Sequence, residues 1–410
     1  MARLLSLNTY HYRRAGADVV FFEHAHMFEE RGWSTAMFAM HHSQNIDSPW
    51  SKYFCEELEF GNQYGLKDTL LRAGRVIYSL DAKRQIERLI TDFKPDIAHA
   101  HCIYHHLSPS VLVALKSRNV PTVMTAHDLK LACPAYKMLN HQGICEKCQS
   151  GNLLHLPLNR CIRESLGAST LVMLESAVHK SLGLYRRYLD KVITPSRFLQ
   201  SKLVEWGWQE EQLAYIPNFI DCRDYTVSTS LGNHILYFGR LAPEKGVDAL
   251  IKAAFHIGVE LEIVGTGPEE AALKAMPEAQ SDRIRFMGRL EKLELRAAIQ
   301  RARAVVLPSR WYENAPMSIL EAYASGRIVI GANIGGIPEL IRPGETGHLF
   351  EVDDVEGLAA LLEQVCAQND HDLLTMGQQA RQWVLEQFDC QRYADSMVNL
   401  YASLNKGVVN

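Results

Sequence analysis

Short apolar runs alternate with longer helical stretches along the chain, and this alternation constrains the fold more than any other feature of the sequence. The predicted strands of the first half are residues 4–7, 34–39, 96–101, 121–126 and 191–194. The predicted helices of the first half are residues 17–31, 66–93, 107–118, 165–184 and 196–206. Such an alternation predicts a parallel sheet that is covered by helices on both faces.

A turn-rich break at residues 216–221 interrupts the pattern, which then starts again. The predicted strands of the second half are residues 233–238, 259–264, 283–287, 304–308 and 327–331. Its predicted helices are residues 246–256, 290–302, 317–325, 354–366, 372–386 and 391–405. We therefore expect an α/β protein of two Rossmann-like domains, residues 1–216 and 217–386, that face each other across a cleft. A C-terminal segment, residues 387–410, follows them.

The composition is that of a globular protein. Of the 410 residues, 47% are hydrophobic and 22% are charged. No apolar run reaches the roughly 18 residues of a membrane-spanning helix, and the first residues do not resemble a secretory signal, so we expect a cytoplasmic protein. The nine cysteines do not predict a secreted disulfide framework. A net charge of −4 gives no support to nucleic-acid binding.

Lysine and arginine outnumber aspartate and glutamate in residues 1–216, whereas the rest of the chain is acidic. The predicted helix 66–93 carries the basic residues Lys67, Arg72, Arg75, Lys83, Arg84 and Arg88. These charges fit an anionic acceptor or peripheral contact with the inner face of a membrane. They equally fit an ordinary solvated surface, and the sequence leaves both interpretations open.

The loop after the predicted strand 304–308 carries the strongest local signal. Its sequence from residue 311 to 321 is WYENAPMSILE, and we expect Asn314 to cap the helix that follows. Free backbone N–H groups at the start of a helix bind anions such as a diphosphate. Here these groups belong to Asn314, Ala315, Met317 and Ser318. Glu313 would then accept hydrogen bonds from a donor sugar and Glu321 from a ribose, unless both are ordinary solvated side chains.

A second signal follows the predicted strand 233–238, where the sequence from residue 238 to 246 is FGRLAPEKG. Gly239 permits a tight turn and leaves room for a ligand. Arg240 offers a planar fork for phosphate, and Lys245 offers a point charge. Together they would neutralise a departing diphosphate, although an ordinary surface loop is the alternative.

These two segments resemble the donor site of glycosyltransferase family 4, the large retaining GT-B family. The resemblance rests on Gly239-Arg240, on Glu244-Lys245-Gly246 and on Glu313 and Glu321, which seven residues separate in the pattern E-x7-E. The linker at 216–221 and the segment GGIPE at 335–339 are also similar to that family's. The resemblance implies a GT-B fold, retention of anomeric configuration and no catalytic metal. It also implies that the C-terminal helix packs back on the N-terminal domain.

The resemblance implies residue roles as well. Arg240 and Lys245 would hold the diphosphate, Glu321 the ribose and Glu313 the donor sugar. His127, after the predicted strand 121–126, would hydrogen-bond the donor sugar and position the reacting centre. Catalysis is thus assigned to His127, Arg240, Lys245 and Glu313.

The N-terminal half departs from the family's pattern. Gly16 would bring its amide towards the diphosphate, but Ala15 replaces a usual second glycine and Asp18 stands where glutamate is common. Arg13 and Arg14 either meet an acidic acceptor or are solvated. The turn at 265–267 would lie near the base and the loop at 333–336 near the nucleotide.

Four cysteines are spaced C-x11-C-x2-C-x12-C, namely Cys133, Cys145, Cys148 and Cys161. The central C-x2-C has the spacing of a structural zinc site, and four thiolates would complete a tetrahedron. Reduced buried thiols and a redox-labile pair are the alternatives, with His141 and His155 as weaker substitute ligands.

The sequence thus predicts transfer of a sugar from a nucleotide-diphosphate donor, a UDP- or GDP-sugar, to a glycan or lipid-linked acceptor. No cofactor is expected for catalysis, and a role in surface polysaccharide or glycoconjugate synthesis is favoured. A sugar-nucleotide epimerase and a non-catalytic scaffold are the rival predictions. A dinucleotide dehydrogenase would need a G-x-G-x-x-G motif, which neither Gly16 nor residues 265–267 supply.

Overall fold

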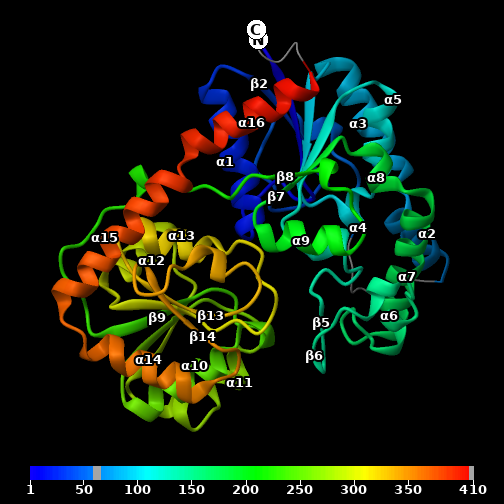
Figure 1. The fold of residues 1–410 in the computed structure, drawn as a ribbon. Helices are drawn as coiled ribbons and strands as arrows, with labels where there is room; N and C mark the ends of the chain where they lie inside the picture. The colour runs from blue at the N-terminus through cyan, green and yellow to red at the C-terminus, as the bar shows by residue number, and fades with distance from the viewer. Residues whose placement is uncertain (59–65, 406–410) are drawn as a thin grey trace. The chain divides into compact units, whose positions relative to one another are not determined.

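The computed structural model describes residues 1–58 and 66–405, and of residues 66–70 it describes only the backbone. The chain divides into two compact units (Figure 1). The first unit contains the chain up to Ile216 and the segment that begins at Tyr393, and the second runs from Pro217 to Arg392. Each unit has its own six-stranded sheet.

The sheet of the first unit is entirely parallel, with the strand order β2-β1-β3-β4-β7-β8. Its strands are β1 (Arg3–Leu7), β2 (Ser34–Phe38), β3 (Ile97–Ala100), β4 (Thr122–Thr125), β7 (Lys191–Thr194) and β8 (Leu213–Tyr215). Every residue of β3 and β4 is buried, as expected for central strands with helices on both faces. The five strands predicted for this half are confirmed, and the edge strand β8 was missed because it has three residues.

The helices of the first unit are α1 (Gly16–Glu30), α2 (Leu66–Ile77), α3 (Leu80–Phe93), α4 (Tyr104–Leu107), α5 (Ser110–Ser117), α6 (His155–Leu158), α7 (Leu166–Leu182), α8 (Leu184–Tyr188), α9 (Arg197–Glu205) and α16 (Cys390–Leu404), the last of which starts in the second unit. The single helix predicted at 66–93 is wrong. Ser79 breaks it and caps α3, because its side chain accepts a hydrogen bond from the Ala82 N–H.

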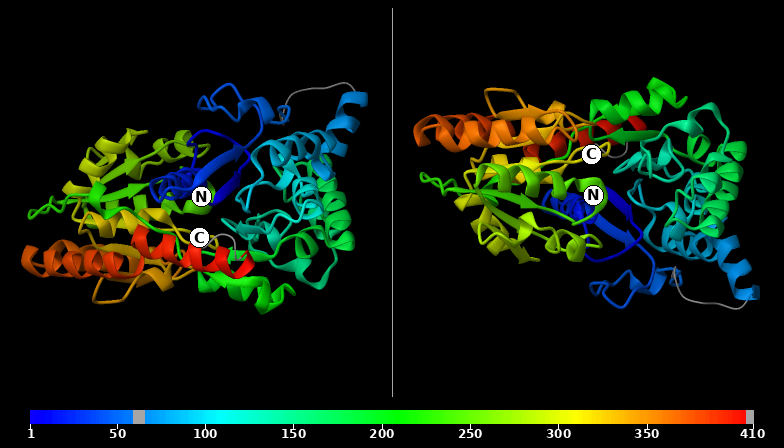
Figure 2. Two further views of the ribbon diagram at one scale, coloured as in Figure 1. Left: turned by 90° about the horizontal axis from the view of Figure 1, so that it is seen from above. Right: turned by 90° about the horizontal axis from the view of Figure 1, so that it is seen from below.

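The last helix, α16, belongs to the first unit from Tyr393 onward. Tyr393, Met397 and Tyr401 are buried at helical spacing, and Asp395 pairs with Arg31 of α1 at 2.8 Å. Figure 2 shows α16, in red, beside the blue N-terminal elements in both views. The implied packing of the C-terminal helix on the N-terminal domain is therefore present.

The second unit repeats the design with the strand order β11-β10-β9-β12-β13-β14. Its strands are β9 (His234–Phe238), β10 (Glu260–Val264), β11 (Ile284–Gly288), β12 (Ala304–Leu307), β13 (Val329–Ala332) and β14 (Gly347–Phe350), all parallel. Its helices are α10 (Val247–Ile257), α11 (Glu270–Lys274), α12 (Lys292–Arg301), α13 (Met317–Ala324), α14 (Val355–Ala367) and α15 (Asp370–Gln387). The five predicted strands are confirmed, and β14 was missed.

Two apolar clusters form the core of the second unit, one on each face of its sheet. The first contains buried side chains of α12, α13 and α15, such as Ile299, Ile319 and Trp383. The second contains those of α10 and α14, such as Leu250 and Leu362. The sheet is therefore covered on both faces, which leaves its edges and strand ends as the places where loops can form a site.

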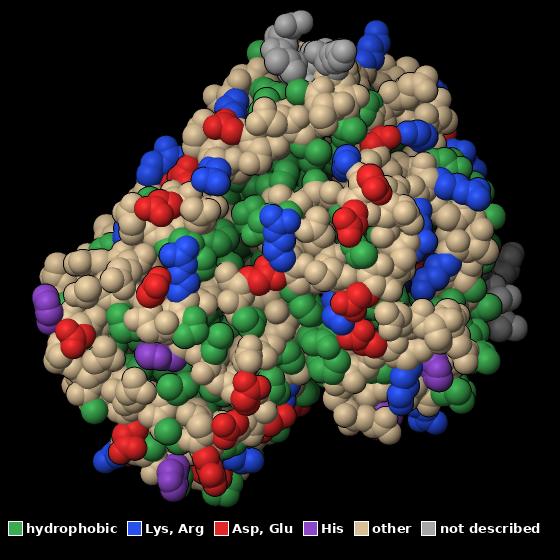
Figure 3. All heavy atoms as spheres, in the orientation of Figure 1, with side chains coloured by type: hydrophobic (Ala, Val, Ile, Leu, Met, Phe, Trp, Pro, Cys, Tyr) green, Lys and Arg blue, Asp and Glu red, His purple; other side chains and the backbone are tan. Residues whose placement is uncertain are grey.

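The surface carries charges of both signs. Lys and Arg side chains are interspersed with Asp and Glu side chains on the face drawn in Figure 3. Arg75 pairs with Glu56 at 3.1 Å and Lys83 with Glu87 at 3.9 Å, so the basic surface predicted around α2 and α3 is partly neutralised. The Lys67 side chain lies outside the described residues. None of the helices in residues 1–58 and 66–405 is long and apolar enough to cross a bilayer.

Candidate active site

The two loops with the strongest sequence signals lie together at one edge of the second sheet. Strand β9 lies between β10 and β12, so the chain leaves it on one side for β10 and later returns on its other side as β12. The loops that follow β9 and β12 therefore start side by side at the carboxyl edge of the sheet and then turn towards its opposite faces. Such a switch point is where open parallel sheets bind ligands.

Glu313 and Lys245 meet at this switch point. The Lys245 ammonium lies 2.6 Å from Glu313 Oε1, and the Ser309 hydroxyl donates to the same oxygen at 2.7 Å. Glu313 is 7% exposed. Burial acts to raise the pKa of Glu313, but the Lys245 charge and the hydrogen bonds outweigh burial and lower the pKa. Glu313 is thus a buried carboxylate that remains ionised at neutral pH.

Neighbouring loops hold the Glu313 backbone in place. The Gly336 N–H donates to the Glu313 carbonyl at 2.7 Å. Gly335 has a φ of +61°, and a Cβ there would lie 2.5 Å from the Glu313 oxygen. Gly246 has a φ of +65°, and a Cβ there would lie 2.0 Å from the Pro308 oxygen. The loops after β9, β12 and β13 therefore pass so closely that only glycine fits at these two positions.

Arg240 is exposed at the end of β9, beside Gly239. Its carbonyl accepts a hydrogen bond from the Tyr237 hydroxyl at 2.9 Å, which fixes the backbone while the guanidinium remains in solvent. In the described part of the chain the guanidinium forms no ion pair. It is therefore available for an anionic ligand.

The helix after Glu313 begins at Met317, as the predicted range 317–325 has it, but its cap is not the predicted one. Pro316 is the N-cap of α13, so the prediction that Asn314 caps the helix is wrong. The residue before a proline is kept out of helical backbone conformations, which prevents Ala315 from starting the helix. The amides of Met317 and Ser318 remain in the first turn, where no intrahelical acceptor exists. The Asn314 and Ala315 amides lie in the preceding loop.

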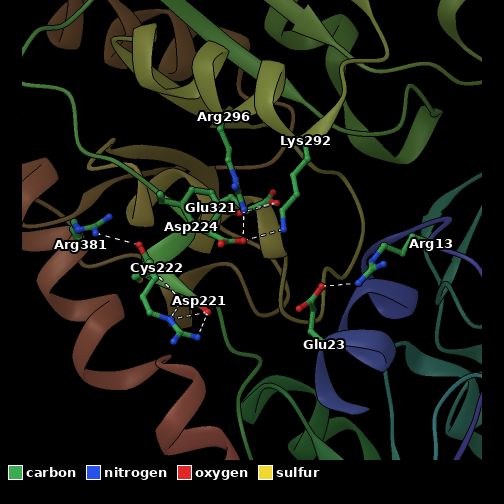
Figure 4. Close-up of polar contacts among 11 residues, drawn as sticks. Arg13, Glu23, Asp221, Cys222, Asp224, Lys292, Arg296, Glu321 and Arg381 are labelled. Atoms are coloured by element: carbon green, nitrogen blue, oxygen red, sulfur yellow. Dashed lines mark hydrogen bonds and ion pairs between the residues drawn. The ribbon is translucent and has the colours of Figure 1, made fainter. Parts of the chain in front are cut away.

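Glu321 lies in α13, just over one turn after its start at Met317, and is half-buried. The Tyr225 hydroxyl donates to Glu321 Oε1 at 3.4 Å, and Lys292 and Arg296 lie nearby on α12, where both pair with Asp224 (Figure 4). Burial raises the pKa of Glu321 to about 7, although Tyr225 and the two cations act to lower it. The carboxyl group therefore titrates near neutral pH.

Residues 13 to 18 of the first unit comprise the end of the loop after β1 and the first turn of α1. Gly16 is exposed as the first residue of α1. Asp18 is buried and accepts hydrogen bonds from the Ala15 N–H at 3.1 Å and from Asn8 at 2.9 Å, so it shapes the turn. Arg13 pairs with Glu23 at 2.8 Å (Figure 4), and Arg14 lies 3.8 Å from Asp18. Both arginines therefore have carboxylate partners within the unit.

His127 follows β4 at the carboxyl edge of the first sheet and is half-buried. Its Nε2 lies 2.8 Å from Nδ1 of His101, which follows β3, and the two rings are stacked. Burial lowers the pKa of His127 to about 4, and burial together with the neighbouring histidines lowers the pKa of His101 well below its ordinary value. Both rings are neutral at physiological pH, so each carries one N–H.

Sequence reasoning missed the buried network that extends behind His127. His99 stacks on His101 and hydrogen-bonds the Tyr401 hydroxyl of α16 at 2.6 Å. The same hydroxyl lies 3.0 Å from Nε2 of His24, whose Nδ1 meets Tyr393. The alternation of histidine at 99 and 101 in a strand was the available signal, since it places both rings on one face. The partners on α16 had no local signal.

The structure also brings the four predicted zinc ligands together. Cys133, Cys145, Cys148 and Cys161 all line one small cavity beside α6. All four are free thiols. As they stand, residues 1–58 and 66–405 contain no group of three or more His, Cys, Asp or Glu side chains that could hold a metal ion.

Comparison with known proteins agrees with this arrangement. Residues 14–224 match the family described as Glycosyltransferase Family 4, and residues 232–368 match Glycosyl transferases group 1. Glycogen synthase from Mycobacterium tuberculosis is 28% identical over 372 residues, which cover 86% of this chain and 78% of that protein. Sucrose-phosphate synthase from Thermosynechococcus elongatus superposes with a TM-score of 0.72 at 21% identity, over 98% of this chain and 99% of that one. HepE from Anabaena, solved in complex with UDP, superposes with a TM-score of 0.68 at 17% identity. The superposition covers 98% of this chain and 100% of that one.

The fold is thus the two-domain α/β fold of GT-B glycosyltransferases. The chain belongs to Glycosyltransferase Family 4, and it is a glycosyltransferase.

Proposed function

We propose that this glycosyltransferase moves a sugar from a nucleotide-diphosphate donor to an acceptor hydroxyl with retention of configuration. The observation that carries the proposal is the Lys245–Glu313 pair at the switch point of the second sheet, with the unpaired Arg240 in the adjacent loop. In such a pair the buried carboxylate can accept hydrogen bonds from the sugar, and the cation can stabilise the anionic group that leaves it. The second unit is then the donor-binding domain and the first the acceptor-binding domain.

In this proposal Arg240, Lys245 and the amides of Met317 and Ser318 bind the diphosphate, with Gly239 leaving room for it. These groups stabilise the charge that develops on the diphosphate as the glycosidic bond breaks, without the help of a catalytic metal. Glu313 accepts hydrogen bonds from the donor sugar while it orients Lys245. The Asn314 and Ala315 amides and the Gly16 amide are additional donors to the same ligand.

His127 is assigned to the donor sugar. If His101 carries its proton on Nδ1, it donates to His127 Nε2, and the single N–H of the neutral His127 ring is then on Nδ1. That N–H is a hydrogen-bond donor for a sugar oxygen. His127 thus positions the reacting centre and does not act as the general base, because the leaving phosphate takes the acceptor proton.

The acceptor is a glycan or a lipid-linked sugar in the assembly of a surface polysaccharide or another glycoconjugate, and the protein works in the cytoplasm. A lipid-linked acceptor would bring it to the inner face of the membrane through the basic residues of α2 and α3, of which Arg75 and Lys83 already have partners.

A thermal-shift screen of UDP, GDP, ADP and NAD(H) tests the donor site. A ligand that binds the native state raises Tm, by the equivalent of about 2.7 kcal/mol at a concentration of 100 Kd. We expect one nucleoside diphosphate to stabilise the protein, and UDP is the first candidate because HepE was solved with it. We expect Arg240→Ala to abolish most of that shift. Arg118→Ala, an exposed arginine at the end of α5, is the matched control and should keep it.

A shift with NAD(H) alone would contradict the proposal, as would an equal UDP or GDP shift in wild type and Arg240→Ala. The epimerase alternative predicts a different outcome in a turnover assay. Donor would then be converted to its epimer without any acceptor, whereas a transferase releases nucleotide and forms a new glycoside when acceptor is added.

Glu321 should give nucleotide binding a pH dependence. An ionised Glu321 accepts hydrogen bonds from both ribose hydroxyls, whereas the protonated form must donate from one oxygen. Because its pKa is raised to about 7, affinity should rise as the pH increases through neutrality, by up to about tenfold per pH unit below the pKa. Calorimetric Kd values for wild type and Glu321→Gln measure this effect. The phosphate of the nucleotide titrates equally in both, so a parallel pH dependence would refute the ribose assignment.

A further inference from the structure

The segment between β4 and α7 contains a side-chain cluster that the transfer reaction does not use. Cys133, Cys145, Cys148 and Cys161 come from different turns of this segment and line one cavity of about 10 Å³. That volume accommodates a single small sphere. Leu139, Leu156, His155 and Trp206 complete the lining.

The part of the segment around the cavity has a small apolar core. Its apolar cluster has three buried members, Cys148, Leu156 and Val172, two of which belong to the segment itself. Five non-glycine residues between 136 and 164 have positive φ, namely Tyr136, Met138, Arg160, Arg163 and Glu164. Such conformations are strained and persist where the surroundings determine them. A segment with many strained turns and a small core therefore needs a further constraint.

Burial and the neighbouring cysteines raise the pKa of the Cys133, Cys148 and Cys161 thiols, so that without a metal ion these side chains stay protonated. The Cys133 sulfur accepts hydrogen bonds from backbone N–H groups of Ala135 and Met138. Three lysines also act in the opposite sense to burial, because their positive charges stabilise nearby thiolates. They are Lys130 beside Cys133, Lys180 beside Cys148 and Lys147 beside Cys161. Backbone donors and cations around a group of sulfurs stabilise the negative charge of a metal–thiolate centre.

We propose that Cys133, Cys145, Cys148 and Cys161 bind one structural zinc ion in this cavity. Each thiol gives up its proton to solvent, and four thiolates surround the ion at roughly 2.3 Å. The side chains must turn towards the cavity centre to reach this distance, since as described they do not form a ready metal shell. The resulting centre has a net charge of −2, which the three nearby lysines offset. Four protein ligands leave no open position, so the zinc is structural and not catalytic.

The four cysteines lie shortly after His127 in the chain, so a zinc ion bound to them would affect the loop that carries this histidine. Cys133 is six residues after His127, and the intervening turn contains Lys130, which pairs with the buried Glu175 of α7 at 2.9 Å. A zinc ion that ties residues 133–161 together would fix the loop that starts at His127. The inference does not depend on the proposed donor or acceptor.

Metal analysis of the full chain purified without added metal or chelator tests the proposal. We expect one zinc per chain, released when a mercurial reagent blocks the thiols. The double substitution Cys145→Ser/Cys148→Ser should lose the zinc and make residues 133–161 susceptible to protease. Cys366→Ser, which removes a free cysteine of α14 in the second unit that does not line the cavity, is the matched control and should retain the metal.

A second measurement keeps the test valid if the double variant fails to fold. Wild-type protein stripped of metal and reloaded with Co²⁺ should show the sulfur-to-cobalt charge-transfer absorption and the visible bands of a tetrahedral thiolate site. The proposal is overturned if the folded protein holds less than a stoichiometric amount of zinc, gives no cobalt spectrum and exposes four thiols to a thiol reagent. Disulfides between these cysteines in the freshly isolated protein would overturn it as well.

Discussion

Replacing Lys245 by alanine is expected to lower kcat by about 10²–10³-fold, the range found when one preorganised group that stabilises developing charge is removed. The ammonium faces the proposed diphosphate and lies 2.6 Å from the buried Glu313 carboxylate. Its loss removes the positive charge and also releases the group assigned to the donor sugar. Initial rates of nucleotide release with saturating acceptor measure the change, with kcat and KM determined separately.

The same variant should also be less stable. Glu313 is 7% exposed and would keep Ser309 as a partner but lose its counter-charge. We expect a loss of about 1–3 kcal/mol in the free energy of unfolding, below the value for fully buried pairs because the Lys245 side chain is 23% exposed. Lys252→Ala, in the exposed face of α10, is the control for removing a lysine nearby. Unchanged kcat in Lys245→Ala would refute the assignment of this pair.

Replacing Glu175 by alanine is expected to cost about 3–5 kcal/mol of unfolding free energy, because it leaves a buried lysine without its counter-charge. Glu175 is fully buried in α7, Lys130 pairs with it at 2.9 Å, and His105 lies 3.1 Å from its other oxygen. Lys130 also donates to the Pro134 carbonyl at 2.9 Å. The pair thus joins the turn after His127 to the helix behind it. Urea unfolding measures the loss.

The pairing also predicts an acid transition. Burial acts to raise the pKa of Glu175, but Lys130 and His105 outweigh burial and lower it to about 2. A carboxyl whose folded pKa is depressed contributes stability above its unfolded pKa, which is about 4.3, and this contribution disappears as the pH falls towards 2. The double variant Lys130→Met/Glu175→Met should recover most of the stability and lose this pH dependence. If Glu175→Ala alone left the free energy of unfolding unchanged, the Lys130–Glu175 pair would not hold the turn after His127.

The sequence was sufficient to predict two parallel sheets and five of the six strands of each. Buried strands such as β3 and β4 are short and rich in apolar and β-branched residues, and the turn residues that end them are visible without any knowledge of packing. The edge strand β8 was missed because three residues carry no usable period, and β14 was missed because it begins with Gly347 directly after a turn. The break at Ser79 was missed because a capping serine between two amphipathic helices leaves the apolar spacing nearly intact.

For the candidate site, the sequence identified residues but not the contacts between them. Glu313, Lys245 and Arg240 could be named from residue type and position after strands, because ligand loops of parallel sheets follow the strand ends. The 2.6 Å contact between Glu313 and Lys245, separated by 68 residues, could not be derived from spacing. The expected Asn314 cap was wrong because the restriction that Pro316 places on its predecessor outweighed the preference of asparagine for caps.

What the sequence by itself determined is therefore the class of fold, the order of its strands and helices and the identity of the charged residues that follow the strands. These properties depend on local periodicity and on residue chemistry. The tertiary structure decided which of those residues meet and in what state. Burial sets the pKa of Glu321 near 7 and keeps His127 neutral, and packing of α16 on α1 places Tyr401 between His24 and His99. Burial and contacts between distant segments are properties of the packed chain, and no local pattern specifies them.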